Sequence, residues 1–278
     1  MKEMAYGHVN QTLITDDTSK YVEEISVRGF TVIPNLISLS DLAIWRLKID
    51  TIYNKQEANF GRERLILIQE LDTCRAPLLY DFDFIRLATI PLVLSLVKYF
   101  LGEWFILNLQ NAIISRPNLV HHQHSWHRDL PYQNYVISRP LAINALVAID
   151  EFSDDTGGTE ILPFSHKTEI LPSDFYIEGN RVTASASPGS VIVFDSMLFH
   201  RAGLNSSQTI RRAVNLLYTL PILKQQYDFP RALGKRDITP DIQRLLGYTC
   251  QVPVNDSEWR EARAERMINQ KLKVSLEQ

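Results

Sequence analysis

The stretch from His121 to Tyr135 reads HHQHSWHRDLPYQNY and contains the pattern His-x-Asp at His127 and Asp129. Residues two apart on an extended segment point to the same side, so these two side chains can hold one metal ion. A third candidate ligand, His200, lies in the later segment VIVFDSMLFHRAG, at the end of a predicted strand and beside a turn. Two histidines and one carboxylate are the ligand set of non-haem Fe(II) sites that activate O₂. This set leaves three coordination positions of the metal open, and O₂ can bind there.

An arginine later in the sequence is the fourth residue of the candidate site. Arg211 lies in a predicted strand over residues 210–220, in which Arg211, Ala213 and Asn215 share a small, polar face and Arg212 lies on the other. A buried guanidinium requires a partner, and the distal carboxylate of 2-oxoglutarate would supply a bidentate one. The alternative is that both arginines are solvated or pair with acidic side chains.

Plainer interpretations of the histidines remain open. An isolated His-x-Asp is more often a hydrogen-bonded surface pair than a metal site. The tract could also bind zinc adventitiously. We interpret His121, His122 and His124 instead as residues at the rim of the site or as polar groups that have hydrogen-bond partners. A structural zinc site would use cysteines or four closed ligands, and neither Cys74 nor Cys250 lies near in the sequence.

The residues from His127 to Asn134, HRDLPYQN, also match the catalytic loop of protein kinases. The other parts of a kinase are missing, since no glycine-rich loop or strand lysine precedes the motif and no Asp-Phe-Gly follows it. Too few roles are filled for phosphoryl transfer.

Apolar or alternating runs bounded by Gly, Pro, Asn and Asp indicate several short strands. They span residues 104–115, 142–149, 191–194 and 213–220. Short strands separated by turn signals favour an antiparallel barrel or jelly roll. We therefore predict an α+β protein with a mainly β core, a double-stranded β-helix (a jelly roll, cupin-like), flanked by N- and C-terminal helices.

Helical patterns lie on both sides of this core. One helix is predicted from Ser19 to Val27, and a strand over 30–34 follows it. A second helix is predicted to begin at Ser40 and Asp41, with an apolar face formed by Leu42, Trp45, Ile49 and Ile52.

Residues 61–82 are expected to be irregular with a short strand over 65–68, and 83–101 to be helical with a break at Pro91. Further helices are predicted over 240–246 and 257–272. We expect one domain over residues 1–278, with N-terminal helical support at 16–103, the core at about 104–220 and a C-terminal helical extension at 221–278.

Ordered motifs in the second half of the chain make a family resemblance specific. They are the His-x-Asp pair, the turn Gly157-Gly158-Thr159, LPFSHK from Leu162 to Lys167, PGSVIVFDSMLFHRAGLN and Arg211-Arg212-Ala213. Together they resemble the phytanoyl-CoA dioxygenase family of Fe(II)- and 2-oxoglutarate-dependent oxygenases, loosely over residues 18–220 and in ordered motifs over 120–220. The resemblance implies a double-stranded β-helix, with Fe(II) on His127, Asp129 and His200 and 2-oxoglutarate on Arg211.

Two features depart from the family pattern, and a third residue refines the expected chemistry. Phe164 stands where the family often has glycine, and the tail after Pro221 resembles no part of the family. Relatives that halogenate replace the carboxylate ligand with a small residue so that chloride can bind the iron. Asp129 fills that position, so the resemblance implies hydroxylation rather than halogenation.

The predicted function is that of a dioxygenase using Fe(II), 2-oxoglutarate and O₂ to hydroxylate an unactivated C–H bond of a small molecule, with release of succinate and CO₂. His127, Asp129 and His200 are its predicted catalytic residues. Substrate contacts are expected from Trp126, Tyr132, Gln133 and Tyr135. The alternative is a β-barrel binding or scaffold protein with a non-catalytic metal site.

Composition, charge and cysteine count predict a soluble protein of a reducing compartment. A net charge of −3 and a pI near 6.2 give no reason to expect nucleic acid or an anionic membrane as a partner. The N-terminus lacks the apolar core of a secretory signal, and the apolar run Pro91–Leu101 is short and carries Lys98. Two cysteines indicate no disulfide framework. We expect a cytoplasmic monomer or homodimer.

Overall fold

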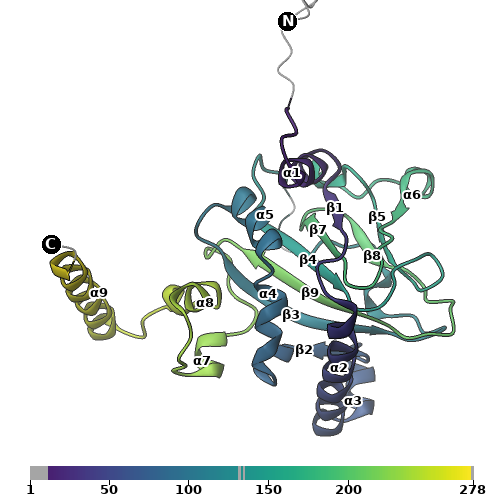
Figure 1. Cartoon of the computed structure of the whole chain (residues 1–278). Coiled ribbons are helices and arrows are strands. Elements are labelled where there is room, and N and C mark those ends of the chain that lie inside the picture. The colour runs from purple at the N-terminus through teal and green to yellow at the C-terminus, as the bar shows by residue number, and fades with distance from the viewer. Residues whose placement is uncertain (1–11, 131–132, 134, 277–278) are drawn as a thin grey trace, which may run out of the picture.

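A six-stranded antiparallel sheet forms the centre of the molecule (Figure 1). The computed structural model describes residues 12–130, 133 and 135–276. Neighbouring strands come from distant parts of the chain, because the order across the sheet is β1-β7-β4-β9-β3-β2. The strands are β1 (Phe30–Ile33), β2 (Thr73–Arg75), β3 (Ile106–Ser115), β4 (Ala142–Ala148), β7 (Val191–Asp195) and β9 (Arg211–Thr219). The four strands predicted for the core are thereby confirmed as β3, β4, β7 and β9.

A second, three-stranded sheet completes the barrel. Its order is β6-β5-β8, and it consists of β5 (Thr159–Ile161), β6 (Val182–Thr183) and β8 (His200–Ala202). One buried cluster joins the two sheets, since it contains Ile161 from β5, Leu146 from β4 and Phe194 from β7. Two antiparallel sheets that enclose one apolar interior form a jelly roll. The predicted fold class is confirmed.

Helices cover the other face of the large sheet (Figure 1). They are α1 (Asp17–Arg28), α2 (Leu39–Phe60), α4 (Ile85–Ala88) and α5 (Pro91–Leu101). The predicted apolar face of α2 is buried, and its Trp45 and Ile49 share one core with Val214 and Leu216 of β9. Helix α2 begins earlier than predicted, because Ser38 and not Ser40 accepts the hydrogen bond from the backbone N–H of Asp41 (3.2 Å).

The segment before β2 differs from the prediction of a strand over residues 65–68. Residues there form helix α3 (Arg62–Leu67), and the strand of this region is β2. Leu65 is buried, but Ile66 and Leu67 are exposed, and Leu65 N–H donates to the carbonyl of Gly61 (3.1 Å), which closes a helical turn. Meanwhile β2 pairs with the edge of β3. The strand prediction is wrong because a short apolar run does not distinguish a helix from a strand.

The C-terminal extension is tied to the barrel at β3. The side chain of Gln225 donates to the carbonyl of Leu107 (2.7 Å), and the backbone N–H of Gln226 donates to that of Asn108 (3.1 Å). The predicted helices over 240–246 and 257–272 are confirmed as α8 and α9, and α9 stands away from the barrel (Figure 1). The remaining elements are α6 (Asp174–Asn180), α7 (Phe229–Leu233), α8 (Pro240–Leu245), α9 (Asp256–Leu276), η1 (Pro77–Leu79), η2 (Phe82–Phe84), η3 (His122–His124), η4 (Ser165–Lys167) and η5 (Tyr248–Cys250).

Within the described part of the chain, no single helix is both long and apolar enough to cross a membrane. The stretches Phe82–Ala88 and Pro91–Leu101 meet these criteria only as a pair, and the pair is bent by 62°.

Candidate functional site

Two histidines from distant parts of the chain lie side by side at one end of the barrel. His127 and His200 form an antiparallel backbone pair, with N–H to carbonyl distances of 3.0 and 3.1 Å. His200 begins β8, so the small sheet fixes the position of this pair. Side chains that face each other across such a pair are neighbours, and the two ring centroids lie 4.4 Å apart. The two predicted imidazole ligands therefore meet.

Each of the two imidazole rings is oriented by a backbone carbonyl. The Nδ1 atom of His127 lies 2.8 Å from the carbonyl of Ser125, and the Nδ1 atom of His200 lies 2.9 Å from that of Leu198. A carbonyl only accepts hydrogen bonds, so Nδ1 carries the hydrogen in both rings and Nε2 presents a lone pair. Burial lowers the pKa of His200, which favours the neutral imidazole that a metal requires.

The carboxylate of Asp129 completes a group of three donors. Its Oδ1 atom lies 3.7 Å from Nε2 of His127 and 3.7 Å from Nε2 of His200. One ligand atom from each residue lies within 4.8 Å of the other two, so the group could hold a metal ion. The backbone N–H of Asp129 donates to the carbonyl of Ser196 (3.2 Å), which fixes this segment against the end of β7.

Arg211 is buried in the same cavity as the three donors. Its guanidinium donates to the carbonyls of Thr156 (3.4 Å) and Gly157 (2.9 Å) and lies 4.4 Å from the ring centroid of Phe152. Burial lowers the pKa of Arg211 to about 10, which leaves the side chain cationic at neutral pH. No carboxylate among the described residues forms an ion pair with it. A buried cation whose partners are only carbonyls and a ring can accept an anionic ligand.

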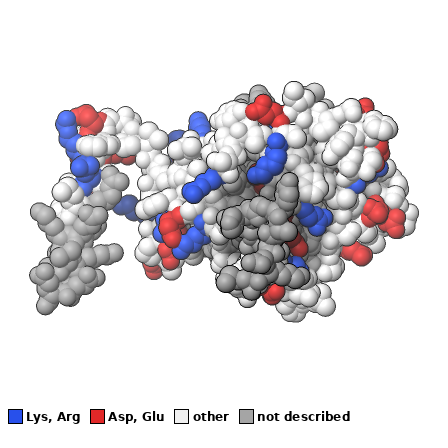
Figure 2. Space-filling view, turned by 90° about the horizontal axis from the view of Figure 1, so that it is seen from above, with Lys and Arg blue, Asp and Glu red and all other residues white. Residues whose placement is uncertain are grey.

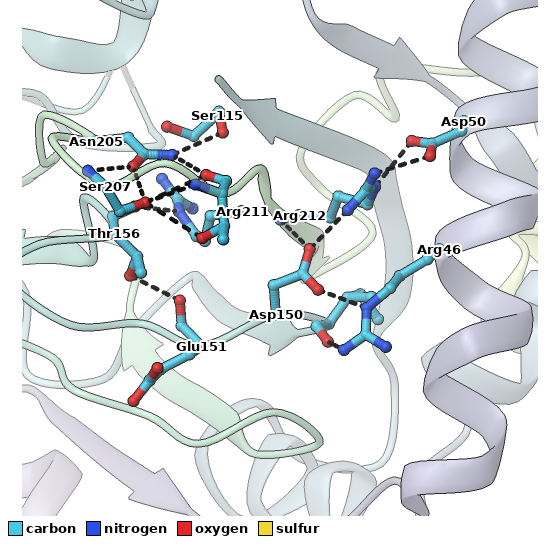
Figure 3. A network of polar contacts seen from close by, with 12 residues as sticks. Arg46, Asp50, Ser115, Asp150, Glu151, Thr156, Asn205, Ser207, Arg211 and Arg212 are labelled. Atoms are coloured by element: carbon cyan, nitrogen blue, oxygen red, sulfur yellow. Dashed lines mark hydrogen bonds and ion pairs between the residues drawn. The ribbon is translucent and has the colours of Figure 1, made fainter. Parts of the chain in front are cut away.

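The neighbouring arginine has a different environment (Figure 3). Arg212 points toward α2, donates to both oxygens of Asp50 (2.8 Å each) and pairs with Asp150 (3.0 Å). Asp150 also pairs with Arg46 (2.5 Å). The predicted two faces of this strand are therefore confirmed, because Arg211 faces the cavity and Arg212 faces the helices.

The Gly-Gly-Thr turn supplies a carbonyl to Arg211 and requires glycine. Gly157 has φ +71°, and a Cβ there would lie 2.6 Å from the carbonyl oxygen of Gly203 and 2.7 Å from the nitrogen of Asn205. A larger residue would push apart the two loops that carry Arg211 and its carbonyl acceptors.

The cavity between the metal group and Arg211 has polar and apolar walls. Its lining residues are Ile113, Gln123, His127, Asp129, Leu146, Thr159, Phe194, His200, Arg201, Ala202, Arg211 and Asn215. All four residues that sequence reasoning placed at the iron and 2-oxoglutarate sites belong to this set.

The other histidines of the tract lie outside the metal group. Nε2 of His121 lies 3.2 Å from the hydroxyl of Thr73, and Nδ1 of His124 lies 3.0 Å from the carbonyl of Ala202. The ring of His122 stacks on that of His121 at 4.2 Å. These contacts agree with the interpretation of satisfied polar groups.

Three of the four predicted substrate residues, Trp126, Gln133 and Tyr135, are not among the described residues that line this cavity. Trp126 packs against Leu162, Ile177 and Phe199 on the outer side of the small sheet, with the guanidinium of Arg201 at 4.9 Å. In the loop after the metal pair, Gln133 is buried and donates to the carbonyl of Tyr135 (2.9 Å), and Tyr135 is exposed. Tyr132 lies outside the described residues.

Sequence reasoning missed one polar residue that touches the metal group. The amide of Asn144, within the apolar strand AINALVA, donates to Oδ2 of Asp129 (2.5 Å). A single asparagine inside a strand that is buried along its whole length was the available signal, because a buried polar group needs a partner.

Comparison with known proteins identifies relatives along most of the chain. The family model described as phytanoyl-CoA dioxygenase matches residues 26–213. The uncharacterized protein Rv1501 of Mycobacterium tuberculosis is 35% identical over 254 residues, which cover 86% of this chain and 90% of that protein. The peroxisomal phytanoyl-CoA dioxygenase of Homo sapiens is 24% identical over 239 residues, covering 74% of this chain and 69% of the human one.

A solved structure shows the same fold. The crystal structure of SnoN, described as a non-heme alpha ketoglutarate dependent epimerase from nogalamycin biosynthesis, superimposes with a TM-score of 0.53 at 18% identity. The match covers 74% of this chain and 83% of SnoN.

Proposed function

The chain belongs to the phytanoyl-CoA dioxygenase family and is an Fe(II)- and 2-oxoglutarate-dependent dioxygenase, and from this premise we propose the roles of its residues. In this proposal His127, Asp129 and His200 hold Fe(II), and Arg211 binds the distal carboxylate of 2-oxoglutarate. The reaction is hydroxylation of an unactivated C–H bond in a small molecule. The observation that carries the proposal is one cavity that contains both a three-donor metal group and a buried arginine. No acidic side chain among the described residues forms an ion pair with this arginine.

The donor atoms fit this pair of ligands. Two Nε2 lone pairs and one carboxylate oxygen face one another, which matches a ferrous ion that must keep positions open for a keto acid and O₂. The guanidinium of Arg211 matches a carboxylate, because its planar fork can form two parallel hydrogen bonds.

The chain's own residues orient the reactants and exclude water. Arg211 holds one end of the cosubstrate, and Ile113, Leu146 and Phe194 form apolar walls of the cavity. When bound, Fe(II) and 2-oxoglutarate supply the reduction of O₂, so that one oxygen atom enters the C–H bond as a hydroxyl and the other enters succinate as CO₂ is released. Asp129 occupies the position that a halide would need, so we propose hydroxylation and not halogenation.

An absorption measurement tests the joint site. Purified protein mixed with Fe(II) and 2-oxoglutarate without oxygen should develop a weak visible charge-transfer band, because the 2-oxo acid chelates the iron. Succinate, which lacks the 2-oxo group, is the matched control and should give no band. Protein that binds Fe(II) but shows no band with 2-oxoglutarate would support a non-catalytic binding protein instead.

A region for the substrate adjoins this cavity on the inner face of β2 and β3. Thr73 pairs with Ile113 and Arg75 pairs with Asn111, and partners in register share one face of a sheet. Because Ile113 lines the metal cavity, this face continues from the metal site onto β2. Cavities of about 460 and 440 Å³ lie on the two sides of the segment that leads into β2, and both are within the range of small-molecule sites.

Charged side chains in these cavities are already paired. Arg75 forms a bidentate pair with Glu70, and Arg116 pairs with Asp72 (2.7 Å). Burial lowers the pKa of His121 to about 3, so this ring is neutral. On the face that Figure 2 shows, Lys and Arg are scattered among acidic residues and form no large basic patch of described residues. We propose an uncharged substrate with a substantial apolar body.

The proposed uncharged substrate differs from phytanoyl-CoA, which the name of the human relative contains. Phytanoyl-CoA carries several phosphate charges, and their binding would require unpaired cations. We expect that phytanoyl-CoA does not stimulate O₂ uptake by the Fe(II)- and 2-oxoglutarate-loaded protein above the rate without substrate. The measurement uses an oxygen electrode, with coenzyme A alone as the control. Stimulation that saturates at micromolar phytanoyl-CoA would refute the uncharged substrate class but leave the metal site intact.

A further inference from the structure

A buried hydrogen-bond chain ends on the carboxylate of Asp129. Asn144 lies in β4, is fully buried, and its amide nitrogen donates to Oδ2 of Asp129 (2.5 Å) and to the side-chain oxygen of Asn215 (3.1 Å). The hydroxyl of Ser196, at the end of β7 and also fully buried, donates to the amide oxygen of Asn144 (2.5 Å). Both hydrogens of the Asn144 amide and its oxygen are thereby used.

These partners fix the direction of the amide. A carboxylate only accepts, so the group that faces Asp129 must be the NH₂ of Asn144. If the amide were reversed, its oxygen would face both the carboxylate of Asp129 and the side-chain oxygen of Asn215, so that acceptors would meet acceptors. The chain Ser196–Asn144–Asp129 therefore has one orientation.

We propose that Asn144 is a positioning residue that sets which oxygen of Asp129 is offered to the metal. This inference rests on the proposed role of Asp129 as a ligand. The hydrogen bond from Asn144 occupies Oδ2, while Oδ1 lies at equal distances from the two Nε2 atoms. A carboxylate held in this way binds through one oxygen, so the remaining metal positions stay open for the cosubstrate and O₂.

Asparagine is suited to this position for a chemical reason. Leucine has nearly the same volume but would leave Oδ2 of Asp129, the Ser196 hydroxyl and the Asn215 oxygen without partners. Aspartate would place a second carboxylate against the first, and the two like charges would repel. Serine is too short to reach all three partners. Only a primary amide of this length offers two donors and one acceptor here.

Metal affinity tests the role of Asn144. We expect Asn144→Leu to raise the dissociation constant for Mn(II), measured by titration of the metal-free protein, by about tenfold to a hundredfold. The charge-transfer band of the anaerobic Fe(II)–2-oxoglutarate complex should also shift or weaken, because the carboxylate is free to turn. A residue with a merely structural role would change neither quantity.

The matched control is Asn108→Leu. Asn108 is a buried asparagine of the same large sheet, but its amide donates to Thr219 and to the carbonyl of Lys224, away from the metal group. This variant loses buried hydrogen bonds as Asn144→Leu does. Its Mn(II) dissociation constant should equal that of the unaltered protein.

A milder variant covers the case in which Asn144→Leu fails to fold. Ser196→Ala removes the hydroxyl that orients Asn144 but keeps the backbone carbonyl that binds Asp129 N–H. We expect it to raise the Mn(II) dissociation constant by about threefold, because the variant loses one hydrogen bond. Unchanged affinity and an unchanged band in both Ser196→Ala and folded Asn144→Leu would overturn the inference.

Mn(II) binding by Asp129→Ala distinguishes a failure of this inference from a failure of the proposed function. If Asp129→Ala abolishes Mn(II) binding while the Asn144 and Ser196 variants bind normally, only the positioning role fails. If Asp129→Ala binds Mn(II) as well as the unaltered protein does, the ligand assignment itself fails.

Discussion

Asp129→Asn is expected to lower the rate of 2-oxoglutarate turnover by more than about a hundredfold, since losing a ligand costs more than losing a residue that supports one. Asparagine has the same shape but cannot satisfy both sides of the position. If its NH₂ faces Asn144, two donors meet, and if it faces the histidines, it presents no lone pair to a metal. Succinate formation and the metal content of the purified variant measure the effect.

A matched substitution shows whether the effect is local. Asp237→Asn removes one negative charge from an exposed position in the C-terminal extension. Its turnover should equal that of the unaltered protein. Full turnover by Asp129→Asn, with folding confirmed by its melting temperature, would rule out Asp129 as a ligand.

Arg211→Met should raise the KM for 2-oxoglutarate by about a hundredfold, because a bidentate pair supplies two charge-assisted hydrogen bonds. Arg211→Lys keeps the charge but not the fork, so an increase of about tenfold is expected. The folded protein should lose little stability in either variant, since no acidic partner is left behind in the described cavity. Initial rates at varied 2-oxoglutarate and thermal melting measure the two effects separately.

The adjacent arginine provides the control for this second substitution. Arg212→Met would leave Asp50 and Asp150 without their shared cation and should lower the melting temperature. Its KM for 2-oxoglutarate should stay unchanged. The opposite pattern, with a raised KM in Arg212→Met and a normal one in Arg211→Met, would contradict the assignment.

Much of the barrel could be predicted from the sequence because burial leaves a clear pattern there. The strand β4 is buried along its whole length and reads as a continuous small, apolar run with one asparagine. Alternation along β9 predicted that Arg211 and Arg212 lie on opposite faces, and the structure places them so. Spacing of two residues also predicted correctly that His127 and Asp129 share a side.

The error in the strand prediction has a physical cause. Sequence patterns do not reveal long-range pairing, so they do not predict the short strand β2, and the exposed apolar run before it has the pattern of a strand. A substrate contact by Trp126 stays a prediction, although this side chain does not line the metal cavity. The alternation that turns His127 and Asp129 inward turns Trp126 and Arg128 outward, and both pack against Phe199 on the far side of the small sheet.

Asn144 could not be assigned a partner without the fold. Its contact with Asp129 joins β4 to the segment that follows η3, and only the folded barrel brings the two side chains together. The sequence could indicate that a buried amide needs partners, but not which ones.

The backbone pair between His127 and His200 has a consequence for how the protein gains and loses its metal. The same main-chain bonds that close the barrel also set the spacing of the two rings, and each ring is anchored a second time at Nδ1. The chain therefore holds its coordinating atoms ready before any ion arrives. If these rings hold the metal as proposed, we expect chelation and reloading to alternate without unfolding of the chain, in contrast to small zinc modules whose architecture exists only around the ion.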